Sequence, residues 1–384
     1  MSDEQQPHSV KGPSSAERWL NCGGSTHIIQ ALKLNEGEDT EDGPEYRREG
    51  TAAHALATIC LRNGQEPWEY AGLEMCGAKV NPEMVEAVQT YVDVCRGVQT
   101  PATRHTYIEQ RLGDPAHPEF FGTLDFAAVG HISADIVDFK YGRGIRVGIE
   151  WNPQLMCYAY LLLMRHPEIT QIGMRIVQPR LGNDGSEHFF LLADAVRRWA
   201  DEHLLPVLMG VGHVADLVPG EHCRFCPAKL HCPALTGIFE VLANAKAAAV
   251  KEMTPEILAA HCDQIEAVNI YIAALKDERM RRLSAGDPVP RWKLVALKAN
   301  RVYRAGVEAI FREKFGKRAY SKPELLSPAQ MEKLGDEAAA MVAEHSYKPD
   351  KGFTCAPVSD PRPAIVIRKA SETFASAAPA EEEF

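Results

Sequence analysis

The segment "SADIVDFKYGRG" (residues 133–144) places an acid and a lysine at the end of an apolar run with the composition of a buried strand. Burying an unpaired ion costs several kcal/mol, so any fold of this chain must supply partners for Asp138 and Lys140. Residues two apart in a strand face the same side, and these two side chains are therefore expected to project together. The segment predicts a charged site at the end of a core strand.

A second acid is expected beside this strand end. Asp125 lies in "GTLDF", thirteen residues before Asp138, and the turn "VGHISA" can join the two strand-like runs into a hairpin. Two adjacent carboxylates repel each other unless a cation lies between them. Oxygen-rich sites of this kind suit Mg²⁺ or Mn²⁺. The hairpin therefore predicts a divalent metal site.

Apolar runs of two periods alternate along the first part of the chain. Amphipathic patterns predict helices over residues 50–62, 82–95, 152–165 and 192–211. Strand-like runs cover residues 105–112, 120–130, 134–140, 171–179 and 187–192. Helices followed by a short meander, and then by alternating helix and strand, indicate an α/β fold with a mixed central sheet flanked by helices.

Composition excludes several classes of protein. With 45% hydrophobic and 24% charged residues, the chain of 384 residues reads as globular, and no apolar run approaches the ~20 residues that a membrane span needs. The first residues, "MSDEQQPHSV", lack the regions of a signal peptide, so we expect a cytoplasmic protein without membrane partners. The net charge of −10 disfavours a surface coated in nucleic acid but leaves room for a local basic groove.

Four short motifs stand in a characteristic order: "GTAAHA" with His54, "GTLD" with Asp125, "DFK", and "QLMCY" with Gln154 and Tyr158 one helical turn apart. In order and spacing they resemble the RecB-like branch of the PD-(D/E)XK nuclease superfamily, with Asp138 where many relatives carry Glu. The resemblance implies a DNA exonuclease that uses Mg²⁺ or Mn²⁺ to hydrolyse phosphodiester bonds.

The same resemblance assigns roles to individual residues. The implied metal ligands are His54, Asp125, Asp138 and the carbonyl of Phe139. Lys140 would orient and help to deprotonate the attacking water, and Gln154 and Tyr158 would support the site and touch the DNA backbone. Glu109, in "YIEQRL", stands where these nucleases often carry an acid ahead of the "GxxD" motif, but its role is open.

The cysteines form a second constellation. "CRFCPAKLHC" contains Cys223, Cys226 and Cys232, and Cys22 lies about two hundred residues earlier. The arrangement resembles the [4Fe–4S] staple of AddB-type helicase-nuclease subunits and CRISPR-associated exonucleases, in which four thiolates hold the cluster. Zinc is the alternative, since tetrahedral thiolate sites also suit it, with His222 and His231 as substitute ligands. The remaining cysteines are interpreted as small buried hydrophobes: Cys60, Cys76, Cys95, Cys157, Cys262 and Cys355.

The chain changes character after about residue 240. A long amphipathic helix is expected over residues 254–286, with His261, Ile265, Val268, Ile272 and Leu275 as its packing face. Residues 276–320 hold 13 Lys/Arg against 5 Asp/Glu. Their interleaved aromatics, Trp292, Tyr303, Phe311 and Phe315, either stack on DNA bases or belong to a core, and both interpretations stay open. We expect a nuclease core over residues 1–240, an extension over 241–368 and a disordered acidic tail over 369–384.

Two further inferences concern partners and class. The terminal "AEEEF" is similar to the acidic tips of single-stranded-DNA-binding proteins, so it either docks a phage single-strand-binding or annealing protein or only solubilises the chain. The stretches "RWKLVALKANRVYR" and "APVSDPRPAIV" resemble a phage-encoded family of unknown function with a RecB-like core, which implies a role in phage DNA recombination or replication. The alternative from another class is a non-catalytic DNA-binding or scaffold protein that retains the nuclease fold.

Overall fold

The computed structural model divides the chain into two compact units, Met1–Tyr271 and Ile272–Phe384. It describes residues 9–34, 45–211, 216–244, 254–256, 259, 262, 264–298, 300–321, 324–350, 352–357 and 360–365. The expected domain boundary near residue 240 falls inside the first unit. The acidic tail 369–384 and His261 lie outside the described residues.

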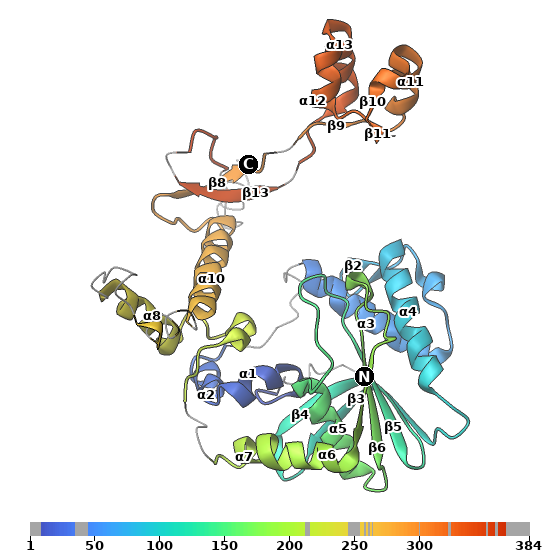
Figure 1. Ribbon diagram of the computed structural model, residues 1–384, viewed down its shortest axis with the longest axis vertical. Helices are drawn as coiled ribbons and strands as arrows, with labels where there is room; N and C mark the ends of the chain where they lie inside the picture. Colours follow the sequence, from blue (N-terminus) through green and yellow to red (C-terminus); the bar gives the residue numbers. More distant parts are fainter. Residues whose placement is uncertain are drawn as a thin grey trace, which may run out of the picture. The chain divides into compact units, whose positions relative to one another are not determined.

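The first unit is built on a five-stranded mixed sheet, which confirms the predicted α/β fold class (Figure 1). Its strands, in spatial order, are β3 (His105–Asp114), β4 (His117–Val129), β5 (Ser133–Phe139), β6 (Gln171–Val177) and β7 (His188–Leu192). Only β5 and β6 pair in parallel; the other neighbours are antiparallel. The predicted hairpin of β4 and β5 is confirmed, with Phe126 opposite Val137.

Helices cover both faces of this sheet. The helices of the first unit are α1 (Ala16–Asn21), α2 (Gly24–Ala31), α3 (Glu45–Asn63), α4 (Pro82–Val98), α5 (Pro153–Arg165), α6 (Ala193–Trp199), α7 (Leu205–Leu208) and α8 (Pro233–Asn244). Short turns of other helix types are η1 (Pro13–Ser15), η2 (Pro67–Tyr70), η3 (Pro179–Leu181), η4 (Ala200–Leu204) and η5 (Glu221–Phe225). A small hairpin of β1 (Glu74–Met75) and β2 (Ala78–Lys79) precedes α4.

Two hydrophobic cores hold the helices to the sheet. On one face, side chains of α1, α5, α6 and α7 pack on Leu124, Ile136 and Met174. On the other, α3 and α4 pack on Phe126, Val137 and Phe139 of the same strands. Because alternate residues of β5 enter opposite cores, Asp138 faces the α5 side, with Ile136.

Local sequence signals set where the helices next to the site begin. Asn81 and Asn152 stand before α4 and α5, and each side-chain oxygen accepts a backbone N–H of the first turn. A proline follows each cap at the first helical position, where its missing N–H costs nothing. The cap at Asn152 thereby fixes the position of Gln154 at the start of α5.

The second unit has its own small core, made by Val307, Phe311, Ala319, Met331 and Val342. Its elements are the end of α10 (Ile265–Ser284), α11 (Val307–Phe315), α12 (Pro328–Met331), α13 (Asp336–His345), η7 (Gly316–Ala319), η8 (Glu332–Leu334) and the strands β8 (Trp292–Ala296), β9 (Val302–Tyr303), β10 (Tyr320–Ser321), β11 (Glu324–Leu325), β12 (Ser346–Tyr347) and β13 (Phe353–Pro357). The strands pair as β8 with β13, β9 with β12 and β10 with β11.

For three of the four interleaved aromatics, the structure supports the core alternative of the two interpretations left open. Phe311 is fully buried, and Tyr303 and Phe315 pack against it. Trp292 is partly buried under the guanidinium of Arg279, 3.6 Å from the ring centroid. Apolar packing accounts for the rings of Tyr303, Phe311 and Phe315, because they face the core of the second unit.

Several Arg and Lys side chains of the same stretch form ion pairs within the protein. Arg281 and Arg282 both pair with Glu278 on α10, and Lys314 pairs with Glu337. The expected face of α10 is wrong as well: Ile265 and Leu275 are about half exposed, whereas Ala267, Ile270 and Ala274 are buried. The buried stripe keeps the helical spacing but is centred on smaller residues, which let neighbouring segments approach closely.

In the described part of the chain, every helix is too short or too polar to cross a membrane.

Candidate functional site

Three ligand-type side chains from three elements meet at one point. His54 of α3, Glu109 of β3 and Asp125 of β4 each place one ligand atom within 4.8 Å of the other two. His54 Nδ1 donates a hydrogen bond to Glu109 Oε1 at 3.2 Å and lies 3.7 Å from Asp125 Oδ1. The structure thus joins the two predicted residues His54 and Asp125 and adds Glu109 as a third member.

A paired irregularity in β3 and β4 aims these carboxylates. Glu109 has a left-handed backbone with φ of 44°, which is uncommon for a residue other than glycine. The β3–β4 ladder keeps one register on both sides of this position, with Ile108 opposite Phe126 and Gln110 opposite Leu124, but it skips the pair of Glu109 and Asp125. Leu124 and Phe126, two apart, enter opposite cores, although a regular strand would turn them to one face. The strands therefore change face at Glu109 and Asp125.

Asp138 and Lys140 form the second half of the site. Lys140 Nζ lies 3.1 Å from Asp138 Oδ2, which confirms that the two side chains project to one side of the strand end. Gln154, from α5, donates from Nε2 to Asp138 Oδ1 at 2.7 Å and accepts from Lys140 Nζ at 2.9 Å. These contacts hold the ammonium group between a buried acid and an amide.

Phe139 links the two halves through its backbone. Its N–H donates to Asp125 Oδ2 at 2.8 Å, so the carboxylate of β4 is fixed against the end of β5. Its ring is buried and stacks on Tyr91, with centroids 4.5 Å apart, while the His54 ring lies at 5.2 Å. The residue whose carbonyl is the implied fourth ligand is thus held firmly at the site.

Burial and charge shift the pKa values of the acids. Burial raises the pKa of Asp138 to about 6, although the neighbouring Lys140 works in the other direction. Burial also raises the pKa of Asp125, against the effect of His54. Repulsion between the acids adds to these shifts. The charge of Asp125 raises the pKa of Asp138, and the charge of Glu109 raises the pKa of Asp125. The carboxylates thus bring several negative charges together in the interior, and a bound cation would reduce the repulsion between them.

The basic groups respond in the opposite sense. Burial disfavours the charged imidazole of His54, but Asp125 and Glu109 outweigh it and raise the pKa of His54 to about 9. Burial likewise disfavours the ammonium of Lys140, but Asp138 and Asp125 raise its pKa above the usual value. The protonated His54 and Lys140 therefore supply the positive charge that balances these carboxylates.

Tyr158 supports the site from inside the fold. The side chain is 3% exposed and its hydroxyl donates to the backbone carbonyl of Thr123 on β4. A contact with a DNA backbone, which the resemblance implied for Tyr158, does not fit a buried hydroxyl already bonded to the sheet. Gly122, the glycine of "GTLD", permits this approach: a Cβ there would lie 2.7 Å from Pro13 Cδ and 3.0 Å from Tyr158 Oη.

The four predicted cluster cysteines come together at a separate place in the first unit. Cys22, at the end of α1, and Cys223, Cys226 and Cys232, around η5, all line one small buried cavity. Backbone N–H groups approach the sulfurs: Val218 N lies 3.4 Å from Cys22 Sγ, and Gly220 N lies 3.4 Å from Cys223 Sγ. Hydrogen bonds to the sulfurs are one way in which a protein surrounds thiolates that hold a metal cluster.

A histidine and an arginine share this cavity. His222 lines the cavity and bonds through Nε2 to the Val218 carbonyl at 2.8 Å. Burial disfavours the charged imidazole, but Cys22 and Cys223 outweigh it and raise the pKa of His222 to about 10. Arg18 also lines the cavity and is 4% exposed. Sequence reasoning missed Arg18, although its position four residues before Cys22 on a helix was a usable signal. His231, the other proposed substitute ligand, does not line the cavity.

The remaining cysteines only partly follow the prediction. Cys60, Cys95 and Cys157 are fully buried, as small hydrophobes should be. Cys76 and Cys262 are exposed and Cys355 is half-buried, so the prediction is wrong for them. Cys76 is exposed because it occupies the turn of the β1–β2 hairpin, with φ of 49° beside Gly77.

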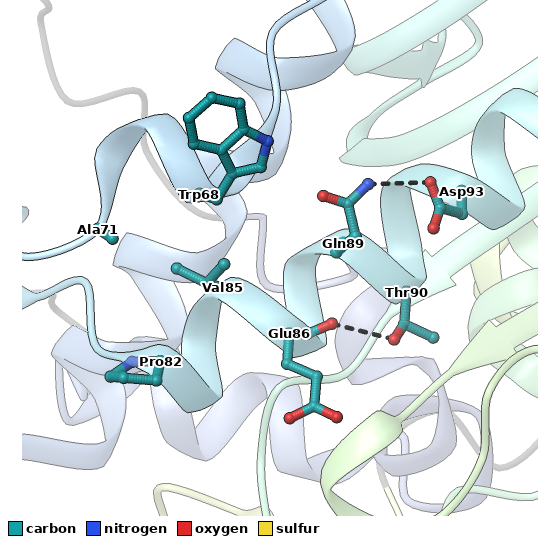
Figure 2. Close-up of a pocket in the computed structure, with 8 residues that line it drawn as sticks. All are labelled: Trp68, Ala71, Pro82, Val85, Glu86, Gln89, Thr90 and Asp93. Carbon is teal, nitrogen blue, oxygen red and sulfur yellow. Dashed lines mark hydrogen bonds between the residues drawn. The ribbon is translucent and has the colours of Figure 1, made fainter.

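A further hollow of about 420 Å³ lies where η2 meets α4 (Figure 2). Trp68 stands over it, and Glu86 and Asp93 from α4 contribute carboxylates to its lining. None of the predicted site residues lines it. Its acids make it unsuited to a polyanion such as DNA, so it does not extend the predicted site.

A comparison with known families gives one match. The sequence profile described as "Protein of unknown function (DUF2800)" matches residues 8–363. The match spans most of both compact units and includes every residue of the two constellations.

Proposed function

The chain belongs to the DUF2800 family of proteins of unknown function, and we propose that it is a metal-dependent nuclease that hydrolyses phosphodiester bonds in DNA. One juxtaposition carries the proposal. The His54–Glu109–Asp125 group and the Asp138–Lys140 pair meet through the Phe139 N–H on Asp125. Three side chains that can bind a metal ion thus lie beside an ammonium group whose position is fixed.

The side chains suit a divalent cation. Among the described residues, the buried Asp138 Oδ2 accepts no hydrogen bond, although Lys140 Nζ is 3.1 Å away. One imidazole and several carboxylates are ligands that Mn²⁺ accepts, whereas Mg²⁺ prefers oxygen alone. His54, Glu109 and Asp125 would hold the ion, with Asp138 and the Phe139 carbonyl next to it. We therefore favour Mn²⁺ over Mg²⁺.

The chemistry assigns a part to each residue. A bound Mg²⁺ or Mn²⁺ supplies an acidified water and positive charge at the phosphate. Lys140, restrained by Asp138 and Gln154, orients the attacking water and balances the charge that develops on the phosphate. Gln154 and Tyr158 position these groups from α5.

The thiol cavity is proposed to hold a [4Fe–4S] cluster as a structural staple. Sulfurs on one tetrahedral zinc ion lie about 3.8 Å apart, given Zn–S bonds of about 2.3 Å. Among the described residues, the cysteine sulfurs form no group of three within 4.8 Å of one another. This wider spacing favours a cluster over zinc. The ligands would tie α1 to η5, two elements that lie about two hundred residues apart in the sequence.

The resemblance to RecB-like PD-(D/E)XK nucleases supports the finer parts of the proposal. By that resemblance the activity is an exonuclease in phage DNA recombination or replication, in the host cytoplasm. The alternative of a non-catalytic DNA-binding or scaffold protein predicts DNA binding without metal-stimulated cleavage.

The test uses the full-length protein purified without oxygen. End-labelled single- and double-stranded DNA is incubated with Mn²⁺, Mg²⁺ or EDTA, and Asp138→Asn is compared with Asp194→Asn, an exposed acid of α6 as control. Metal-dependent cleavage that Asp138→Asn abolishes and Asp194→Asn retains supports the proposal. Binding without cleavage favours the scaffold alternative. Iron and sulfide analysis separates a cluster from zinc.

A further inference from the structure

We propose that Arg18 is the buried counter-charge of the metal group held by the four thiolates, and so determines whether that group is retained. The inference rests on the proposed function of the thiol cavity. Arg18 would act as a positioning residue, not as a ligand. It is one of the cavity-lining side chains, together with Cys22, Cys226 and Ser25.

The helix places Arg18 beside the first cysteine. Arg18 lies in α1 and Cys22 caps the C-terminus of that helix, with the Cys22 N–H donating to the Arg18 carbonyl at 2.8 Å. Residues four apart lie on one face of a helix. The Arg18 side chain therefore extends along the face that carries Cys22 into the cavity.

Hydrogen bonds to two described residues, Ser25 and Val10, help to hold the guanidinium in that position. Nη1 donates to Ser25 Oγ at 2.7 Å, and Nη2 donates to the Val10 carbonyl at 3.2 Å. Ser25 Oγ in turn donates to the Cys22 carbonyl at 2.6 Å. The positive charge is thus tied to the backbone of a cysteine ligand through a single serine.

Charge balance explains why a cation belongs there. Four thiolates outweigh the double positive charge of a zinc ion or of an oxidised [4Fe–4S] core, so the loaded group keeps a net negative charge. Such a charge is costly in a buried cavity unless a cation lies nearby. The Arg18 side chain lines the same cavity as Cys22 and Cys226 and is itself 4% exposed. Each buried charge thereby offsets the other.

The test compares Arg18→Gln and Arg18→Lys with Arg96→Gln in the full-length protein. Arg96 is likewise a hydrogen-bonded arginine of the first unit. It is partly buried and is bonded to Glu66 and the Gln65 carbonyl, far from the cavity. Iron, sulfide and zinc content are measured after anaerobic purification. The rate of metal loss to a chelator is then followed from visible absorbance or from a metal indicator.

Arg18→Gln is expected to lose its metal at least about tenfold faster than wild type, and to shift the reduction potential of a cluster to a more negative value. Arg18→Lys keeps the charge and should show a smaller loss, while Arg96→Gln should match wild type. Should Arg18→Gln fail to fold, Ser25→Ala, which removes only the tether, is expected to accelerate metal loss to a smaller degree.

The outcomes separate this inference from the proposed function. Equal metal retention in wild type, Arg18→Gln and Ser25→Ala overturns the role of Arg18 and leaves the thiol site standing. Wild-type protein that carries neither iron nor zinc overturns the thiol site and the role of Arg18 together. A loss that Arg96→Gln shares to the same extent also overturns the inference, because it would reflect general instability.

Discussion

Glu109 Oε1 lies 3.2 Å from His54 Nδ1, although the two residues are 55 positions apart and Glu109 holds a left-handed backbone inside a strand. A strained backbone costs of order 1–3 kcal/mol and persists where the surroundings require it. Here the strain turns a carboxylate toward the imidazole and Asp125. We therefore include Glu109 among the ligands of the proposed metal site.

Glu109→Gln is expected to weaken Mn²⁺ binding by roughly 10- to 100-fold while the fold remains intact. The amide keeps the size of the side chain but removes its charge. Isothermal titration of the metal-free protein with Mn²⁺ measures the effect. Glu119→Gln, at an exposed acid of β4 that pairs with Lys11, is the matched control. Equal affinities for Glu109→Gln and wild type would exclude Glu109 as a ligand.

Lys140→Ala is expected to lower the rate of DNA cleavage by about 10²- to 10³-fold, the usual effect of removing one group that stabilises transition-state charge. The affinity for Mn²⁺ should not fall, because Lys140 repels the ion. Cleavage is measured with saturating Mn²⁺, and Lys79→Ala, on the exposed strand β2, serves as control. A loss of cleavage that follows a loss of metal would assign Lys140 a structural role instead.

Gly122→Ala is expected to destabilise the protein by about 1–3 kcal/mol, the usual cost of overpacking a core. The added methyl group would press on Pro13 and on the Tyr158 hydroxyl, at 2.7 and 3.0 Å. Urea unfolding measures the change. Gly148→Ala adds the same methyl group where nothing lies within 4 Å and should leave stability nearly unchanged. Equal stabilities would show that η1 and α5 move apart freely.

Strand patterning was sufficient to predict the α/β sheet, the β4–β5 hairpin and the common side of Asp138 and Lys140, because all three follow from a period of two. Glu109 could not be assigned in the same way. Its approach to His54 depends on a change of face within β3 that no local propensity announces. Tyr158 was placed on the correct helix face, but its burial depends on Gly122 and Pro13, which are distant in sequence.

The second unit and helix α10, which begins in the first unit, show the limit of periodicity more clearly. Phe311 fits a base-stacking residue and a core residue equally well in sequence, and only the packing of Val307, Met331 and Val342 around it decides. Along α10, a stripe of Ala267, Ile270 and Ala274 is buried in place of the larger residues beside it. Hydrophobic size is thus a poor guide where close approach selects alanine.

The stability of the metal-free protein should fall as pH rises from about 6.5 to 9, and His54 accounts for one part of this fall. The pKa of His54 rises from 6.5 to about 9 in the folded state, since Asp125 and Glu109 outweigh the effect of burial. A raised folded-state pKa adds stability that is complete below pH 6.5 and is lost as pH passes through 9. Urea unfolding in EDTA at several pH values measures the slope.

With Mn²⁺ present, the stability of the protein should instead rise with pH, because the ion and the proton compete for the same imidazole. Its affinity is expected to rise by up to about tenfold per pH unit below pH 9, where binding must displace the proton from His54. His54→Ala should lose the steep pH dependence of Mn²⁺ binding and should reduce the pH slope of stability, whereas His131→Ala, an exposed residue between β4 and β5, should change neither. The slope that remains in His54→Ala is expected from His222, whose pKa is raised to about 10. Mn²⁺ binding that is independent of pH in the wild-type protein would remove His54 from the metal site.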